Sequence, residues 1–227
     1  LVILFYKKFI KVSKNKLLDS LIISKGHATS AAYFILSDLG VLKKKEWINW
    51  GKKKSILRIF GNHKIPGIEA TTGSLGHGVG IGSGISITNK NDGIKNKVFV
   101  IISEGELYEG STWESLLFAS HNKLENLCVI IDVNQLIILG KTKDCLNLDS
   151  IEKKMKSFNF DVSVCNGHDL RAIEKALTKK KLNKKPKCII CNTIKGKGSS
   201  IMENKPNWHY WNKLTEEEIS KTRKELS

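Results

Sequence analysis

The chain has 227 residues, enough for one sizeable α/β core, and 41% of them are hydrophobic, which excludes a disordered tail. The formal net charge is +16, yet the lysines are scattered and no recognition-helix, zinc-finger or aromatic RNA-binding signature accompanies them, so we expect no nucleic-acid site. No apolar run approaches the roughly 20 residues that span a bilayer, so we expect no membrane segment either.

The N-terminal residues and the cysteines bear on processing and compartment. Leu1–Tyr6 resembles the end of an amphipathic element, and since the chain begins without Met we expect an N-terminal stretch to be absent. This stretch lacks the basic flank and cleavage site of a signal peptide. Five cysteines, an odd number, favour reduced thiols and a cytoplasmic protein.

Short apolar runs alternate with helical patterns along the chain. The run Leu21–Ile23 comes first, and the later predicted strands, rich in Val and Ile, are Val98–Ile102, Leu127–Asp132, Phe160–Cys165 and Cys188–Thr193. Predicted helices are opened by a capping box of Ser111 with Glu114, by Asp149 with Glu152, and by Thr215 with Glu218, and another carries Leu170, Ile173 and Leu177 at helical spacing. This alternation predicts a three-layer α/β sandwich with a mostly parallel sheet, in a single domain of residues 1–227.

Cys188 and Cys191 form a C-x-x-C pattern within the last predicted strand. Residues three apart on a strand point to opposite faces of its sheet. We therefore interpret the two cysteines as core residues and not as a redox or zinc site.

Two early segments carry glycine beside histidine. In Ser24-Lys-Gly-His27, Gly26 would let the chain turn and project His27 from the carboxyl end of a strand. The stretch from Gly73 to Gly84 would allow a ligand close to the backbone at a helix N-terminus. It is neither a P-loop nor a dinucleotide fingerprint, because it lacks the terminal Gly-Lys-Ser/Thr and no clear strand leads into it.

Two polar side chains follow successive predicted strands. Glu104 comes directly after Val98–Ile102, and Asn134 follows Leu127–Asp132. Parallel strands joined by one helix are sheet neighbours or nearly so, which brings a carboxylate and an amide oxygen to the same edge. Hard oxygen ligands that share a cation with phosphates suit Mg²⁺. Capping of the next helix explains one or two of Glu104, Glu106 and Glu109, but not the coupling to Asn134.

The last candidate segment is Thr193-Ile-Lys-Gly-Lys-Gly198, followed by Trp208-His-Tyr210. Lysine and glycine beside a strand end suit a phosphate. Taken alone, this segment is better interpreted as a solvated basic loop.

In their order, these segments resemble the N-terminal, diphosphate-binding domain of transketolase, and most closely the separately encoded N-terminal transketolase subunit. The likeness runs from Leu1 to Trp211. Glu104-Gly-Glu…Asn134 is similar to the thiamine-diphosphate motif that begins Gly-Asp-Gly and ends in Asn about thirty residues later. The other matching patterns are Ser24–His27, Thr72–Gly78, Glu109-Gly110, His121–Leu124 and Asn166-Gly-His-Asp169.

The resemblance implies two-carbon ketol transfer from a ketose phosphate to an aldose phosphate, with thiamine diphosphate and Mg²⁺ as cofactors. Metal ligands would be Glu104, Asn134 and the carbonyl of Leu136. The cofactor would be bordered by His27, Gly73, Leu75, Gly105, Glu106, Asn134 and His209. The residues expected to take part in catalysis are His27, His63, Glu109 and His209; His27 and His63 would face the sugar, and Glu109 would lie at the subunit interface.

The sequence departs from the family pattern in three ways. Glu104 stands where the motif usually has Asp, and the upstream Ser-His-Ile-Gly-Gly-type segment is missing. The pyrimidine-binding domain is also absent, so the resemblance implies a C-terminal partner subunit, with a homodimer of this chain inside a heterotetramer. Two alternatives stay open: a subunit of another thiamine diphosphate enzyme, of the 2-oxoacid dehydrogenase or deoxyxylulose-phosphate synthase type, and a non-catalytic remnant.

Overall fold

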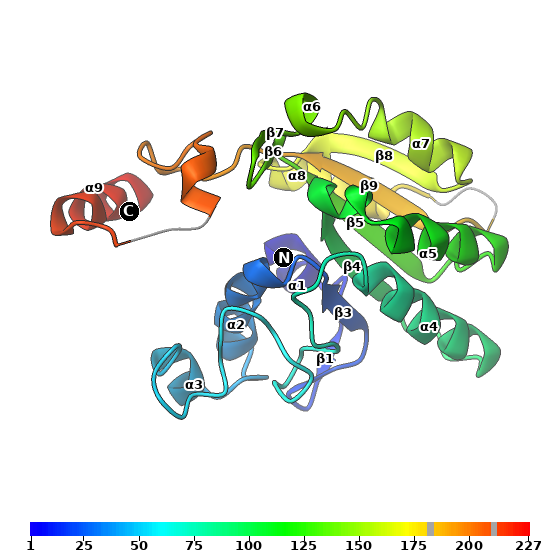
Figure 1. Cartoon of the computed structure of the whole chain (residues 1–227). Helices are drawn as coiled ribbons and strands as arrows, with labels where there is room; N and C mark the ends of the chain where they lie inside the picture. The colour runs from blue at the N-terminus through cyan, green and yellow to red at the C-terminus, as the bar shows by residue number, and fades with distance from the viewer. Residues whose placement is uncertain (181–183, 210–212) are drawn as a thin grey trace.

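A five-stranded parallel sheet forms the centre of the protein in a computed structural model that describes residues 1–180, 184–209 and 213–227 (Figure 1). Its strands lie in the order β3-β4-β5-β9-β8. Their bounds are Ser20–Ile23 for β3, Val98–Ser103 for β4, Leu127–Val133 for β5, Lys187–Asn192 for β9 and Asp161–Asn166 for β8. The predicted strands are confirmed to within a residue or two, and every adjacent pair is parallel.

Helices cover both faces of this sheet, which confirms the predicted three-layer sandwich. One hydrophobic core lies beneath α1 (Val2–Tyr6), α2 (Thr29–Asp38) and α8 (Leu170–Thr178). The other lies beneath α4 (Gly78–Asn91), α5 (Gly110–His121) and α7 (Ile151–Ser157). Cys188 belongs to the second core and Cys191 to the first, so the two cysteines do point to opposite faces, as predicted.

Shorter elements complete the described chain. The 3-10 turns are η1 (Gly26–Ala28), η2 (Glu104–Tyr108) and η3 (Pro206–His209). Two small hairpins pair β1 (Val12–Ser13) with β2 (Lys16–Leu17) and β6 (Leu136–Ile137) with β7 (Gly140–Lys141). The remaining helices are α3 (Lys44–Ile48), α6 (Thr142–Cys145) and α9 (Glu216–Leu226). Helix α9 lies apart from the sheet (Figure 1). No helix within the described residues has the length and apolarity of a membrane span.

The predicted helix starts are partly wrong. The capping box of Thr215 with Glu218 is confirmed at the start of α9. Ser111 caps no helix, however, because α5 begins at Gly110 with Glu109 at its N-cap, two residues before the predicted cap. The Ser111 hydroxyl instead donates to the carbonyl of Gly76 at 3.1 Å. Helix α7 is capped by Ser150 and not by Asp149, which has a positive φ of 47°.

Candidate functional site

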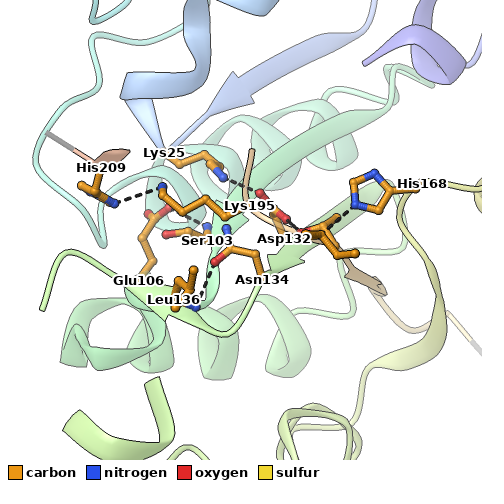
Figure 2. Close-up of polar contacts among 11 residues, drawn as sticks. Lys25, Ser103, Glu106, Asp132, Asn134, Leu136, His168, Lys195 and His209 are labelled. Atoms are coloured by element: carbon orange, nitrogen blue, oxygen red, sulfur yellow. Dashed lines mark hydrogen bonds and ion pairs between the residues drawn. The ribbon is translucent and has the colours of Figure 1, made fainter. Parts of the chain in front are cut away.

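The polar residues of interest gather at the carboxyl ends of β3, β4, β5 and β9. Strands β3, β4, β5 and β9 are consecutive in the sheet, so the loops that follow them meet at one edge. Figure 2 shows side chains from these loops turned toward one another, with Lys25 after β3, Glu106 after β4, Asn134 after β5 and Lys195 after β9. The site is therefore assembled from loops that are far apart in sequence.

Glu106 holds the first loops together from the inside. Its side chain is fully buried and receives hydrogen bonds from the Ser24 hydroxyl, from the Gly76 amide at 3.1 Å and from the Ser103 amide at 3.2 Å. Burial raises the pKa of Glu106, and these hydrogen bonds offset part of the cost. Ser103 and Glu106 also form a capping box for η2. The resemblance placed Glu106 beside the cofactor; the structure shows that its carboxylate is engaged by protein groups.

The glycine-rich turn before α4 is packed too tightly for other residues. Gly76 has a φ of +88°, and a Cβ there would lie 2.6 Å from the Ser111 hydroxyl oxygen. A Cβ on Gly78 would lie 2.3 Å from the side chain of Ser24, whose hydroxyl accepts the Gly78 amide at 3.1 Å. Glycine is required here for close approach of backbone to side chain, and the turn is fixed against Ser24 and Glu109.

Glu104 lies buried against the loop that follows β5. Its exposed fraction is 3%, and its Oε1 atom has no hydrogen-bond partner among the described residues. Burial raises the pKa of Glu104 to about 7, although backbone amides of Gln135, Leu136 and Asn134 oppose the shift. The Glu104 carboxylate thus lies against the backbone of the loop that carries Asn134, and the sharing of one metal ion by the two side chains stays a prediction.

Asn134 is itself held in a tight turn. Its Oδ1 accepts the Leu136 amide at 3.0 Å, and Gln135 between them has a positive φ of 61° (Figure 2). Leu136 opens the β6–β7 hairpin. The three residues predicted to hold a metal, Glu104, Asn134 and Leu136, therefore come from one contiguous contact between η2 and the β5–β6 loop.

A cluster of basic side chains lies on the other side of the same edge. Lys195 Nζ is 3.2 Å from His209 Nδ1 (Figure 2), and the rings of His27 and His209 are 5.7 Å apart. Lys25 forms an ion pair with Asp132. Burial would raise the pKa of Asp132, but the charge and hydrogen bond of Lys25, together with Thr193 and His168, outweigh burial and the net shift is downward.

This cluster lowers the pKa of its own members. Burial, followed by the charges of Lys25, His209 and Lys195, lowers the pKa of His27 to about 4. Burial and the charge of Lys195 lower the pKa of His209, and burial with Lys25 lowers that of Lys195. The lysine ammonium groups held this close favour an anionic ligand, and His27 is neutral near pH 7, in the form that accepts a proton.

The remaining predicted residues lie around this edge with differing exposure. His63 is exposed on the loop before α4, and its Nδ1 lies 3.0 Å from the Thr71 hydroxyl. Gly73 and Glu109 are exposed, and Leu75 and Gly105 are partly exposed. The predicted segment Trp208–Tyr210 is described only as far as His209; Tyr210 and Trp211 lie outside the described residues.

The sequence did not single out Lys25, Asp132, Lys195 or His168 as site residues. Asp132 accepts the Thr193 hydroxyl at 2.5 Å in addition to Lys25, and His168 accepts the Ile194 amide at 2.8 Å. Asp132 was predicted only as the last residue of a buried strand. A charged residue at that position is a signal that could have been used, since strand ends in parallel sheets carry ligand sites.

The described residues fit a metal bound to a diphosphate. No group of three His, Cys, Asp or Glu gathers within them, which excludes a closed site of the zinc type there. A buried carboxylate oxygen without a partner, beside an amide oxygen and a backbone turn, suits a hard cation that keeps other oxygens for its ligand. The basic cluster opposite suits the negative charge of the phosphates.

Comparison with known proteins gives one family. A family model described as transketolase, thiamine diphosphate binding domain, matches residues 4–227. An apulose-4-phosphate transketolase subunit of Actinobacillus succinogenes is 40% identical over 85% of this chain and 70% of its own length. The 6-deoxy-6-sulfo-D-fructose transketolase subunit SqwG of a Clostridium species is 34% identical over 88% of this chain and 73% of its own.

Solved structures agree with this result. Transketolase from Campylobacter jejuni superposes with a TM-score of 0.82 and 29% identity, over 91% of this chain and 34% of that one. Human transketolase is 34% identical over 84% of this chain but only 30% of its own length. The chain thus spans about a third of these two transketolases and about 70% of the relatives that are named as subunits.

Proposed function

The chain belongs to the transketolase family and matches the thiamine diphosphate-binding domain of that family, and we propose that it is the N-terminal subunit of a split transketolase. In this role it binds thiamine diphosphate with Mg²⁺ for the transfer of a two-carbon ketol unit from a ketose phosphate to an aldose phosphate. The names of its relatives support a split enzyme, because several of them are themselves transketolase subunits.

The observation that carries the proposal is the division of charge at the sheet edge. Glu104 and Asn134 offer oxygens on one side, and Lys25 and Lys195 offer positive charge on the other, where His209 is the hydrogen-bond partner of Lys195. A metal diphosphate has the matching division, a cation and an anion in contact. Glu104, Asn134 and the Leu136 carbonyl would hold the metal, while the basic cluster would neutralise phosphate oxygens.

The chain's own side chains would supply binding, orientation and proton transfer. Bound thiamine diphosphate supplies the carbanion chemistry of ketol transfer, which no amino-acid side chain provides. His27 is neutral near pH 7, so it can accept a proton from a sugar hydroxyl and return it. His63, exposed on the loop before α4, would contact the sugar, and His209 beside Lys195 would contact the diphosphate.

The proposal extends to assembly and location. The chain would pair with itself, Glu109 lying at that interface, and two copies of a C-terminal subunit with the pyrimidine-binding domain would complete a heterotetramer. A cytoplasmic location is supported by the five cysteines, all of which are free thiols.

Titration of the protein with thiamine diphosphate in the presence and absence of Mg²⁺ tests the binding role. We expect heat release or tryptophan quenching that requires the metal. Asn134→Ala should abolish the metal-dependent part while circular dichroism stays unchanged. An exposed amide elsewhere, Asn147→Ala, serves as the matched control. Metal-independent binding that Asn134→Ala leaves intact would contradict the proposal.

A further inference from the structure

Hydrogen bonds hold the backbone on both sides of Lys195. It lies in the loop after β9, where the Thr193 amide donates to the Val133 carbonyl at 2.8 Å and the Asn204 amide donates to the Lys195 carbonyl at 2.9 Å. The residue directly before it, Ile194, donates its amide to the Nε2 atom of His168 at 2.8 Å (Figure 2). A side chain from the β8–α8 turn therefore fixes the backbone of the residue that precedes Lys195.

Hydrogen bonds and close packing hold the turn that carries the His168 imidazole. Asn166 Oδ1 accepts the His168 amide at 2.9 Å, and the Gly167 amide donates to the Asn192 carbonyl at 2.7 Å. A Cβ on Gly167 would lie 2.4 Å from the Thr193 side chain, so only glycine lets the two loops approach this closely. Asp169 then caps α8 by accepting the amides of Arg171 and Ala172.

The hydrogen bond also fixes the state of the ring. Because a backbone amide can only donate, Nε2 must be the unprotonated nitrogen, and the ring proton is on Nδ1. The ring binds the Ile194 amide, whereas Lys195 Nζ lies against His209, so His168 is linked to Lys195 through the backbone of Ile194. The ring is exposed, and its bond to Ile194 is a link between the two loops that a substitution can remove without emptying the core.

We propose that His168 is a positioning residue for the diphosphate site, acting through Ile194 to hold Lys195 beside His209. This inference rests on the proposed function and adds to it a residue outside the ligand-contacting set. An apolar side chain at position 168 would leave the Ile194 amide without its acceptor, and the loop would relax. Lys195 would then spend less of its time at the distance from His209 that the structure shows.

The test compares His168→Leu with His168→Gln, since Gln carries an acceptor oxygen to nearly the position of Nε2 while Leu does not. Affinity for thiamine diphosphate with Mg²⁺ is measured by calorimetry on the full chain. We expect His168→Leu to weaken binding by about fivefold to tenfold, the loss of one hydrogen bond. We expect His168→Gln to bind within about twofold of the parent, as the loss of a few tenths of a kcal/mol would allow.

A double-mutant cycle separates positioning from a general structural effect. Lys195→Met removes the group through which His168 is proposed to act, so adding His168→Leu to it should cause no further loss of affinity. Asp169→Ala, which weakens the same turn through α8, should lower thermal stability but keep the affinity. Hydrogen exchange at the Ile194 amide should speed up in His168→Leu and stay slow in His168→Gln.

The outcomes distinguish this inference from the proposed function. If the parent protein does not bind the cofactor, the proposed function fails. If the parent binds and Lys195→Met weakens binding, yet His168→Leu binds like the parent or loses equally in both backgrounds, the positioning role is wrong. Should His168→Leu fail to fold, His168→Asn, whose acceptor is too short to reach Ile194, takes its place against His168→Gln.

Discussion

At the residue scale, Glu104 combines deep burial with an incomplete set of partners. One carboxylate oxygen has no hydrogen-bond partner among the described residues, and its exposed fraction is 3%. A buried charge without a partner destabilises the folded protein. Such a residue persists where a bound ligand compensates for this unfavourable free energy. The motif position that usually holds Asp is filled here by a longer side chain that reaches the backbone of the β5–β6 loop.

Replacing Glu104 by Gln should stabilise the metal-free protein. The folded pKa of Glu104 is raised from 4.5 to about 7, so its unfavourable contribution is absent below pH 4.5 and complete above pH 7. Glu104→Gln should therefore raise the free energy of unfolding by about 1–3 kcal/mol at pH 8 and leave it nearly unchanged at pH 4.5. Urea unfolding at the two pH values measures this difference.

The same variant should lose its response to Mg²⁺. We expect the parent protein with thiamine diphosphate to gain stability when Mg²⁺ is added, and Glu104→Gln to gain much less. Glu152→Gln, an exposed carboxylate in a surface ion pair, is the control for charge removal. A destabilised Glu104→Gln at pH 8 would show that the unpaired oxygen is not the cost that we infer.

Sequence reasoning found the residues at strand ends and missed those joined by long-range pairing. Glu104 and Asn134 follow predicted strands, so the parallel topology alone brought them to one edge. Lys25 and Asp132 are 107 residues apart, and their ion pair depends on the order of β3, β4 and β5 in the sheet, which no local pattern encodes. The hydrogen bonds of Glu106 to Ser24 and Gly76 are likewise non-local, so no local pattern predicts them, while the place of Glu106 beside the cofactor stays a prediction.

At the scale of single elements, Lys187 fastens the end of α8 to the sheet. This residue of β9 is buried, and its ammonium group donates to the carbonyls of Ala176, Leu177 and Lys179 at 2.9–3.2 Å. Carbonyls at a helix C-terminus lack partners within the helix, and a cation there also complements the helix dipole. The charge that would be costly in a buried strand is thereby satisfied.

Lys187→Met should destabilise the protein although it adds an apolar side chain to the core. The carbonyls at the end of α8 would lose a charged donor, at a cost of about 2–3 kcal/mol. Lys175→Met removes the same charge from an exposed position of α8 and should change stability by less than about 0.5 kcal/mol. Chemical unfolding of both variants provides the measurement, and equal effects from the two would contradict the capping role.

Strands were easier to predict than the starts of helices. A parallel strand buried on both faces has a continuous apolar run, which identifies β4, β5 and β9 almost to the residue. Ser111 with Glu114 matched a capping pattern, but the Ser111 hydroxyl binds Gly76 across 35 residues instead. A tertiary contact therefore overrode a local signal, just where the glycine-rich turn packs against α5.

At the scale of the whole molecule, the net charge is +16. We expect the lysines that produce it to be solvated on the surface and not to form a nucleic-acid site. The lysine clusters lie at Lys43–Lys45, Lys52–Lys54, Lys153–Lys156 and Lys179–Lys185, of which residues 181–183 lie outside the described part. A gel-shift titration should show only weak binding that falls steeply as salt rises. Tight binding to a defined sequence at physiological salt would overturn this expectation.

The exposed face of α5 bears on the assembly that we propose. Leu117 is 56% exposed and Phe118 is 45% exposed, and neighbouring α4 adds Ile81 at 37% (Figure 1). Exposed apolar side chains favour association, because their contact with water is unfavourable. We expect the segment Trp113–Ser120 to face the partner, as we expect of Glu109 just before it.

The chain alone should be inactive in ketol transfer and should gain activity only with a C-terminal partner. The names of its relatives, several of which are transketolase subunits, motivate this prediction. Purified by itself, it should bind thiamine diphosphate weakly, run as a dimer in size-exclusion chromatography, and release no product from xylulose 5-phosphate.

Phe118→Glu should shift the dimer toward monomer, whereas Phe34→Glu, an exposed aromatic of α2, should not. Adding the partner should restore turnover to the parent protein and much less to Phe118→Glu, since a charged side chain would be buried without a partner at the interface. Turnover of xylulose 5-phosphate by this chain alone would defeat the split-enzyme proposal, and turnover of pyruvate by the reconstituted pair would indicate another thiamine diphosphate enzyme.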